Sequence, residues 1–166
     1  MKDQKKYILS KEVVEKKLRR MAFEILENNI DEKEIILAGI RESGSVVAKV
    51  IRQMLGEISS IKTELITITL DKKTPSDVTL SKSIDFNEKV IILIDDVSNS
   101  GKTLLYALKP FVEFQPKKIQ TLVLVERTHT SFPVRPDYVG LSIATTLLEH
   151  IFVEVKGEEV TGAYLK

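Results

Sequence analysis

The chain has 166 residues, of which 43% are hydrophobic and 30% are charged, and it contains no cysteine. This length suits one domain with its own core, and the lack of cysteine excludes disulfide frameworks, thiolate zinc sites and cysteine nucleophiles. Because 25 Lys and Arg residues balance 24 Asp and Glu residues, the formal net charge of +1 provides no overall attraction to nucleic acid or membranes.

The first part of the chain predicts a helix, a strand and a second helix. Apolar residues recur at helical spacing from Val13 to Leu26, after Ser10, a residue suited to an N-cap position. The continuous apolar run from Ile35 to Ile40 predicts a buried strand. Helical spacing returns from Val46 to Leu55, and Gly56 predicts the end of that helix.

The second part predicts further strands around one more helix. Leu65 to Leu70 alternates apolar residues with threonines, as a strand does, and residues 71–88 form a long connection. The most apolar strand, Val90 to Ile94, is followed by a helix predicted from about Gly101 to Phe114 and kinked or ended near Pro110. Later strands are predicted at Ile119–Val125, Tyr138–Ile143 and Ile151–Val155.

Strands that alternate with helices indicate an α/β protein with a largely parallel sheet. We see no internal repeat or linker, and we expect residues 1–166 to form a single domain. No apolar run approaches the ~20 residues of a membrane helix, and no apolar stretch of a signal peptide follows the basic start at Lys2. We therefore expect a cytoplasmic protein.

The most informative stretch runs from Val90 to Thr103 and reads V-I-I-L-I-D-D-V-S-N-S-G-K-T. An apolar strand leads into two carboxylates, Asp95 and Asp96, and then into a small polar loop that opens a helix. Ligands of open α/β sheets bind at the carboxyl ends of strands. Hydroxyls and free N–H groups of Ser98 to Thr103 would form an anion cradle suited to phosphate. The carboxylates could accept hydrogen bonds from sugar hydroxyls or hold a metal ion.

Two other interpretations of this stretch compete with the phosphate cradle. The two aspartates could merely end a strand, with the residues from Ser98 to Gly101 as a turn. A nucleotide triphosphatase loop is disfavoured, because it needs a glycine five positions before Gly101, where the chain has Asp96. None of the seven glycines belongs to a dinucleotide-binding G-x-G-x-x-G pattern.

The same stretch resembles the phosphoribosyl pyrophosphate (PRPP) signature of type I phosphoribosyltransferases. That signature has apolar residues, two acidic residues, a small polar loop, Gly, any residue and then Thr or Ser, and Asp95, Asp96, Gly101 and Thr103 match it in register. The resemblance implies that Asp95 and Asp96 hold the ribose hydroxyls and, indirectly with PRPP, a Mg²⁺ ion. It implies that the 5-phosphate is wrapped by Val97, Ser98, Asn99, Ser100, Gly101, Lys102 and Thr103.

Nearly the whole chain is similar to the bacterial pyrimidine-operon attenuation proteins that are also uracil phosphoribosyltransferases. The matching segments are the opening Ile8-Leu9 with its helix through Asn28, Leu37–Gly44, Leu65–Leu70, Ile119–His129 and the family-specific Phe132–Gly140. The similarity implies a single-domain type I phosphoribosyltransferase fold. In that fold a mainly parallel central sheet is flanked by helices and carries a small hood and a mobile flap.

The resemblance assigns roles to three further segments. The loop that grips pyrophosphate would consist of Gly39, Ile40, Arg41, Glu42, Ser43 and Gly44. The flap would run from Leu70 to about Lys82, and its Lys72 would join Arg41, Asp95 and Asp96 as catalytic residues. The base would lie near Val125, Glu126 and Arg127, although Arg127 could instead pair structurally with Glu126 or Asp137.

The chain departs from the family at several cationic positions. Ser43 stands where the family has an arginine, and Lys72 stands where the flap has an arginine with its planar fork. On the basic face that relatives use for RNA, Phe23 replaces a histidine and Thr130 an arginine, while Arg20 is kept. RNA is therefore a disfavoured partner.

These residues predict a glycosyltransferase that condenses PRPP with a nucleobase to give a nucleoside 5′-monophosphate and pyrophosphate. The expected base is uracil, and the expected cofactor is Mg²⁺. The expected partners are these small molecules and further copies of the chain, in a homodimer or higher homo-oligomer. The alternative is a PRPP- or nucleotide-sensing regulator of pyrimidine genes that binds mRNA with weak or no catalysis. A third interpretation is a structural relative that binds nothing.

Overall fold

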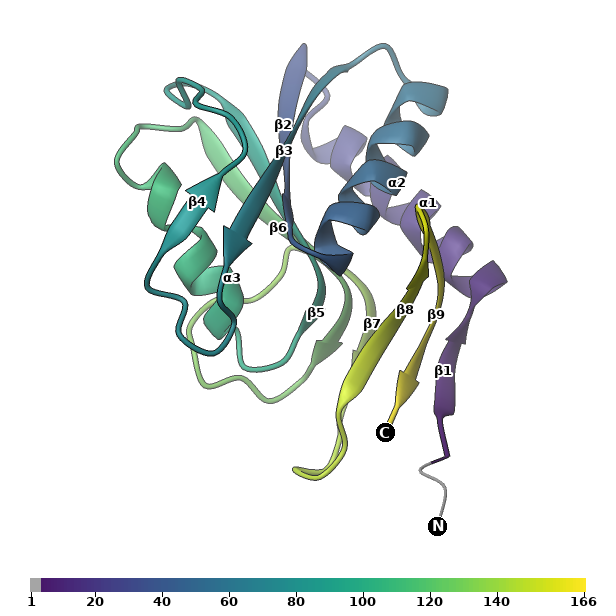
Figure 1. Ribbon diagram of the computed structural model, residues 1–166. Helices are drawn as coiled ribbons and strands as arrows, with labels where there is room; N and C mark the ends of the chain where they lie inside the picture. The colour runs from purple at the N-terminus through teal and green to yellow at the C-terminus, as the bar shows by residue number, and fades with distance from the viewer. Residues whose placement is uncertain (1–3) are drawn as a thin grey trace.

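The computed structural model describes residues 4–166, and within them the strands form two sheets (Figure 1). The elements are β1 (Lys6–Ser10), α1 (Lys11–Asn28), β2 (Glu34–Ile40), α2 (Ser43–Ile58), β3 (Lys62–Leu70), β4 (Val78–Leu80), β5 (Val90–Ser98), α3 (Lys102–Ala107), the 3₁₀ turn η1 (Lys109–Phe111), β6 (Lys118–Arg127), β7 (Tyr138–Ile143), β8 (Ile151–Lys156) and β9 (Glu159–Leu165). The predicted α/β class with its parallel central sheet is confirmed.

The larger sheet has the strand order β4-β3-β2-β5-β6-β7 within the described residues, and every pair except β3–β4 is parallel. Its central strands β2 and β5 carry continuous apolar runs, as strands covered on both faces do. Ile35, Leu37, Ile92 and Ile94 belong to the cluster that contains α1 and α2. Ile36, Ala38, Ile91 and Leu93 belong to the cluster that contains α3 and η1.

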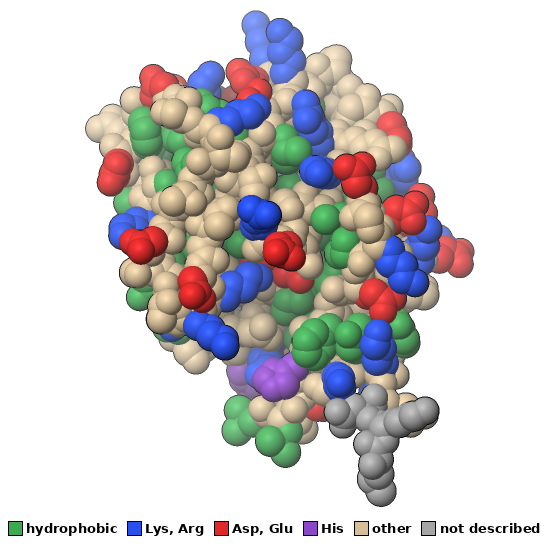
Figure 2. All heavy atoms as spheres, viewed as in Figure 1, with side chains coloured by type: hydrophobic (Ala, Val, Ile, Leu, Met, Phe, Trp, Pro, Cys, Tyr) green, Lys and Arg blue, Asp and Glu red, His purple; other side chains and the backbone are tan. Residues whose placement is uncertain are grey.

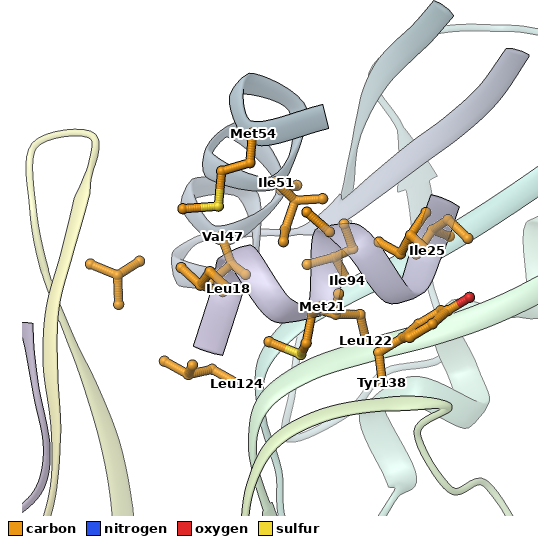
Figure 3. Packing of buried hydrophobic residues seen from close by; sticks show 14 of the residues in the cluster. Leu18, Met21, Ile25, Val47, Ile51, Met54, Ile94, Leu122, Leu124 and Tyr138 are labelled. Atoms are coloured by element: carbon orange, nitrogen blue, oxygen red, sulfur yellow. The ribbon is translucent and has the colours of Figure 1, made fainter. Parts of the chain in front are cut away.

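The first helix forms as its sequence predicts. The Ser10 hydroxyl caps α1 by accepting a hydrogen bond from the Val13 N–H at 3.3 Å. Leu18, Met21 and Ile25 of this helix pack with residues of α2 and of the sheet (Figure 3). The hydrophobic stripe at spacings of three and four residues therefore places α1 on one face of the sheet.

The smaller sheet, which we call the hood, has the order β1-β9-β8 and joins the two ends of the chain (Figure 1). All its strands are antiparallel. Leu9 and Ala163 are paired and buried in the core. The sequence predicted the strand at Ile151–Val155 but missed β1 and β9, because their pairing joins residues about as far apart as the chain allows.

The break predicted near Pro110 is confirmed, whereas two other predicted boundaries are wrong. The helix predicted from about Gly101 ends at Ala107 and gives way to η1, which contains Pro110, a residue without the N–H that a continuing helix needs. The helix α2 passes through Gly56 to Ile58, where Ser59 forms the C-cap. The strand β5 continues past Asp95 and Asp96 to Ser98. In addition, the long connection 71–88 contains the short strand β4.

No helix among residues 4–166 is long and apolar enough to cross a membrane.

An aromatic cluster holds the connection between β4 and β5 on the sheet. Phe86 is buried and meets Phe111 edge-on at 4.9 Å between ring centroids and Phe114 at 5.2 Å. Edge-to-face pairs of this kind add to the burial of the rings themselves. The cluster ties the segment before β5 to η1 and so supports the strand that leads to the carboxylates.

We expect Phe86→Ala to lower the free energy of unfolding by about 3–5 kcal/mol, the range for large-to-small changes of a buried Phe. Urea denaturation followed by circular dichroism measures this change. Phe23→Ala, which removes a ring that is 48% exposed on α1, is the matched control and should change stability by less than about 1 kcal/mol. Equal losses for the two variants would contradict the assigned packing.

Candidate functional site

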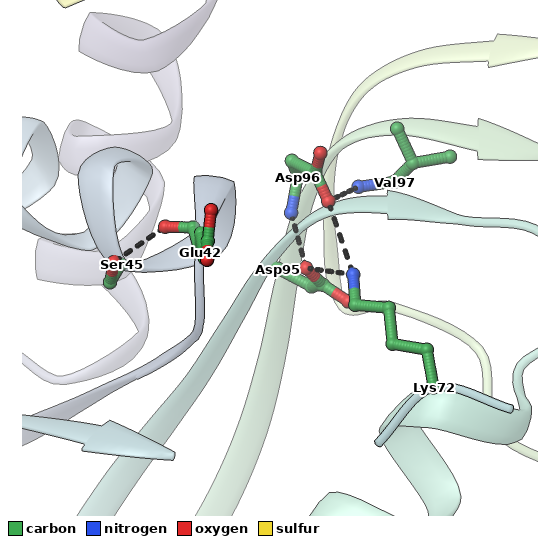
Figure 4. A network of polar contacts seen from close by, with 6 residues as sticks. All are labelled: Glu42, Ser45, Lys72, Asp95, Asp96 and Val97. Atoms are coloured by element: carbon green, nitrogen blue, oxygen red, sulfur yellow. Dashed lines mark hydrogen bonds and ion pairs between the residues drawn. The ribbon is translucent and has the colours of Figure 1, made fainter. Parts of the chain in front are cut away.

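Two aspartates lie near the carboxyl end of the central strand β5. Asp95 is fully buried, whereas Asp96 is partly exposed. Asp95 Oδ1 accepts a hydrogen bond from the Asp96 N–H, and Asp96 Oδ1 accepts one from the Val97 N–H, both at 2.8 Å (Figure 4). Asp95 Oδ2 is buried without a hydrogen-bond partner among the described residues. Asp95 Oδ2 therefore remains as an acceptor for a bound ligand or ion.

A lysine from the segment after β3 reaches both carboxylates. Lys72 Nζ lies 3.4 Å from Asp95 Oδ1 and 3.8 Å from Asp96 Oδ1 (Figure 4). These contacts join two residues that the sequence assigned separately, one to the flap and one to the PRPP signature. The side chain of Lys72 remains 48% exposed, so it can leave the carboxylates without opening the core.

Burial controls the protonation of this cluster. Burial and the neighbouring Asp96 raise the pKa of Asp95 well above its ordinary value, and Lys72 only partly opposes this effect. For Lys72, partial burial opposes the charged form, but Asp95 and Asp96 outweigh it and raise the pKa of the ammonium group. The site thus holds a buried carboxylate that ionises reluctantly and a firmly charged lysine beside it.

The N-terminus of α2 comes unusually close to Asp95. A Cβ at Gly44 would lie 2.9 Å from both the Cα and Oδ1 of Asp95, so only glycine permits this approach. The peptide bond between Arg41 and Glu42 is cis. Arg41 and Glu42 line a hollow together with Ser43 and Lys72. Gly39 and Ile40 are buried within β2.

The predicted phosphate loop lines a pocket of about 400 Å³. It is lined by residues 97–104, by Ser43, Lys72 and Asp96, and by Ile151, Phe152 and Val153 of the hood. Ser98 is 3% exposed, and its Oγ has no hydrogen-bond partner among the described residues. A buried hydroxyl without a partner is costly, so it points to a polar ligand in this pocket.

The family-specific segment 132–140 supports this loop from behind. The N–H groups of Ser131 and Phe132 both donate to the Ser100 carbonyl at 3.0 Å. Gly101 has a φ of +86°, and a Cβ there would lie 3.1 Å from the Val134 carbonyl oxygen. Only glycine combines this backbone conformation with this close contact. The segment therefore acts as a scaffold for the loop.

The residues expected near the base, Val125, Glu126 and Arg127, do not line this pocket. Val125 is buried in the core. Glu126 Oε1 accepts a hydrogen bond from the Ser142 hydroxyl at 2.7 Å. Arg127 Nη2 donates to the Glu149 carbonyl at 2.6 Å, so its partner is neither Glu126 nor Asp137. A base role for these residues stays a prediction.

Phe152 is the site residue that the sequence analysis missed. It lies on β8 between the core-facing Ile151 and the partly buried Val153, and its side chain is 42% exposed in the wall of the pocket. An aromatic residue on the exposed face of a strand was the available signal. The sequence alone does not show that this strand lies near β5, so the signal could not be connected with the site.

The carboxylates of this site could bind magnesium only together with a substrate and water. No group of three or more His, Cys, Asp or Glu side chains within residues 4–166 could hold a metal ion alone. The free Oδ2 of Asp95 and the partly exposed Asp96 nevertheless provide the carboxylate oxygens that Mg²⁺ prefers. Magnesium commonly binds through one or two carboxylates and completes its coordination with substrate oxygens and water. These residues suit that mode.

Comparisons with known proteins agree with this geometry. The sequence model of the phosphoribosyl transferase domain family matches residues 5–159. The chain is 33% identical over 156 residues to the bifunctional protein PyrR of Streptococcus pneumoniae strain CGSP14, covering 90% of both chains. Two solved structures share its fold. These are hypoxanthine phosphoribosyltransferase of Trypanosoma cruzi (TM-score 0.79, 13% identity, 97% of both chains) and hypoxanthine-guanine phosphoribosyltransferase of Bacillus anthracis (TM-score 0.71, 22% identity, 87% and 85%).

Replacing Asp95 by asparagine should stabilise the protein at neutral pH. An aspartate in an unfolded chain has a pKa of about 3.9, and in the folded protein the pKa of Asp95 is raised. As the pH rises above about 4, ionisation therefore favours the unfolded wild type, and stability falls until the folded pKa is passed. We expect Asp95→Asn to unfold at a higher urea concentration than the wild type at pH 7.

This difference should shrink to nothing as the pH falls below about 4, where the aspartate is protonated in both states. Asp31→Asn, at an exposed position, is the matched control and should change the stability at pH 7 by less than about 0.5 kcal/mol. A wild type that is as stable as Asp95→Asn at pH 7 would disprove the reluctant ionisation of Asp95.

Proposed function

We propose that the chain, which belongs to the phosphoribosyl transferase domain family and is a phosphoribosyltransferase, joins PRPP to a nucleobase. The base that we propose is uracil. The observation that carries the proposal is one pocket that combines Asp96, the neighbour of the buried Asp95 on β5, with the loop of residues 97–103. The products would be a nucleoside 5′-monophosphate and pyrophosphate. The similarity to PyrR proteins supports a pyrimidine base.

The 5-phosphate would occupy the loop between β5 and α3. The Ser98 hydroxyl, which has no partner in the described residues, would donate to a phosphate oxygen, as would free N–H groups of the loop. A helix start adds a partial positive charge at this place. Lys102 and Thr103 line the same pocket and supply further donors.

The ribose would lie over Asp95 and Asp96, whose oxygens would accept hydrogen bonds from its two hydroxyls. In the structure Lys72 occupies this place near both carboxylates. When PRPP enters, the ammonium group would move from the carboxylates toward the pyrophosphate, where Arg41 also lies along the adjoining hollow. One cation would thus neutralise the site before binding and the leaving group after it.

The reaction needs little covalent chemistry from the protein. A ring nitrogen of the base forms a bond to C1 of the ribose while the bond from C1 to pyrophosphate breaks, and the nitrogen loses its proton. Lys72 and Arg41 would stabilise the negative charge that gathers on the departing pyrophosphate. Magnesium bound with PRPP would supply further neutralisation of that charge. The flap would keep water away from the reacting carbon.

Two substitutions test the assignment of the site. We expect Asp96→Asn and Ser98→Ala each to weaken PRPP binding by roughly tenfold or more, because each removes a hydrogen bond to a charged or sugar group. Isothermal titration with PRPP and Mg²⁺ measures this loss. Asp31→Asn and Ser60→Ala, both at exposed positions outside the pocket, are the matched controls. Wild-type affinity in Asp96→Asn would contradict the ribose assignment.

Catalysis itself is tested by incubating the protein with PRPP, Mg²⁺ and a panel of bases that includes uracil, hypoxanthine and guanine. We expect pyrophosphate release with at least one base and the fastest release with uracil. A protein that binds PRPP but releases no pyrophosphate with any base would refute the enzyme and leave the nucleotide-sensing regulator.

The regulator is the second candidate, because the similar PyrR proteins are described as bifunctional. One expected RNA contact is already used inside the chain. Arg20 pairs with Glu24 at 2.8 Å and donates to the carbonyls of Val139 and Gly140. Exposed Phe23 adds no charge to this face.

We expect the protein to bind a pyrimidine-operon leader RNA no more tightly than a scrambled RNA of equal length. A salt titration in a gel-shift assay measures both affinities. Selective binding of the leader would overturn this expectation and favour the regulator. The homo-oligomeric state and the cytoplasmic location stay predictions.

A further inference from the structure

A row of aromatic side chains crosses the hood and ends at the pocket. Phe152 on β8 is the cross-strand partner of Tyr164 on β9, which is in turn the partner of Tyr7 on β1. Paired residues of an antiparallel sheet project to the same face. The three rings therefore share the face opposite to Leu9, Ala163 and Ile151, which are buried in the core. Hydrophobic side chains gather over the hood strands in Figure 2.

The rings contact one another in sequence. The centroids of Phe152 and Tyr164 are 5.3 Å apart with an interplanar angle of 18°, so these two rings are stacked. Tyr7 and Tyr164 are 5.6 Å apart at 56°. His150 meets the edge of Phe152 at 6.5 Å. Phe152 is thus supported by Tyr164 on one side while it remains 42% exposed in the wall of the pocket.

A carboxylate holds the outer end of this row. Glu154 Oε2 accepts hydrogen bonds from Lys5 Nζ at 3.0 Å and from the Tyr7 hydroxyl at 3.2 Å. Glu154 Oε1 accepts one from the Thr161 hydroxyl at 3.2 Å. Lys5 Nζ also lies 4.5 Å from the centroid of the Tyr164 ring, within the range of a cation–π contact. Lys5 and Tyr7 therefore contact the Tyr164 ring, and Glu154 holds these two residues in place.

We propose that Tyr164 is a positioning residue of the base subsite, which fixes the Phe152 ring so that its free side can stack on the nucleobase. The inference rests on the proposed function, because only a bound base would use this ring. A phenylalanine on an exposed strand without such support would sample several rotamers. A ring that is already fixed avoids that loss of conformational freedom when the base binds.

A positioning role for Tyr164 differs from ordinary packing, because it affects the binding of the base and not that of the phosphate or ribose. The base would contact Phe152, whereas the phosphate and ribose would contact the loop and carboxylates around β5. Loss of Tyr164 should therefore weaken only ligands that carry a base. A phenylalanine at position 164 keeps the stacked ring and should preserve base binding.

The test compares ligands that carry a base with a ligand that lacks one. Nucleoside 5′-monophosphates (UMP and IMP) and ribose 5-phosphate are titrated by calorimetry into the wild type, Tyr164→Ala, Tyr164→Phe and the control Phe23→Ala. We expect Tyr164→Ala to weaken the tighter nucleotide by roughly three- to tenfold, the effect of one aromatic pair. Ribose 5-phosphate should change by less than about twofold. Tyr164→Phe and Phe23→Ala should behave as the wild type.

Tyr7→Ala provides a second variant at a position that is 54% exposed, so its folding is not at risk. It should weaken the nucleotide in the same selective way by about twofold. Equal weakening of nucleotide and ribose 5-phosphate, or no restoration by Tyr164→Phe, would overturn the inference while the proposed function stands. A wild type that binds neither ligand would overturn the proposed function and this inference together.

Discussion

A fully buried carboxylate, that of Asp95, lies near the end of the central strand, and the groups around it are arranged against its Oδ1 atom. The Asp96 N–H and Lys72 Nζ both contact Oδ1, and the start of α2 approaches so closely that only glycine fits at position 44. Burial still raises the pKa of Asp95. A fold selected only for stability would place an apolar or neutral side chain here.

Two buried polar atoms at or near this carboxylate lack the partners that a bound ligand would supply. Asp95 Oδ2 and Ser98 Oγ are both buried without hydrogen-bond partners among the described residues. They lie at the same edge of the sheet, one at the base of the carboxylate pair and one in the loop that follows. Their cost to the fold is consistent with the rule that local imperfections gather at functional sites.

The molecule divides recognition between its two sheets. The parallel sheet brings the carboxylates, the phosphate loop and Lys72 together at the carboxyl ends of β5 and β3. The hood faces them with Phe152, and in our proposal it supplies the base subsite. Because β1 and β9 bring the two ends of the chain into this hood, residues as distant as Tyr7 and Tyr164 contact each other beside one site.

Local patterns were enough to predict much of this protein. Ser10 and the apolar stripe after it determine α1, and the apolar runs that became β2 and β5 require a sheet covered on both faces. The stretch from Val90 to Thr103 predicted where a phosphate cradle would lie. Each of these features depends on residues a few positions apart, whose spacing can be recognised without knowing the rest of the fold.

Only the tertiary structure decided which distant residues meet. Lys72 reaches Asp95 across 23 positions, Arg127 donates to Glu149 rather than to Glu126 or Asp137, and Phe152 lines the pocket. The strands β1 and β9 left no strong local signal because buried and exposed residues do not alternate regularly along them. Their stability comes from pairing across the length of the chain, and such contacts leave no periodic pattern in a single sequence.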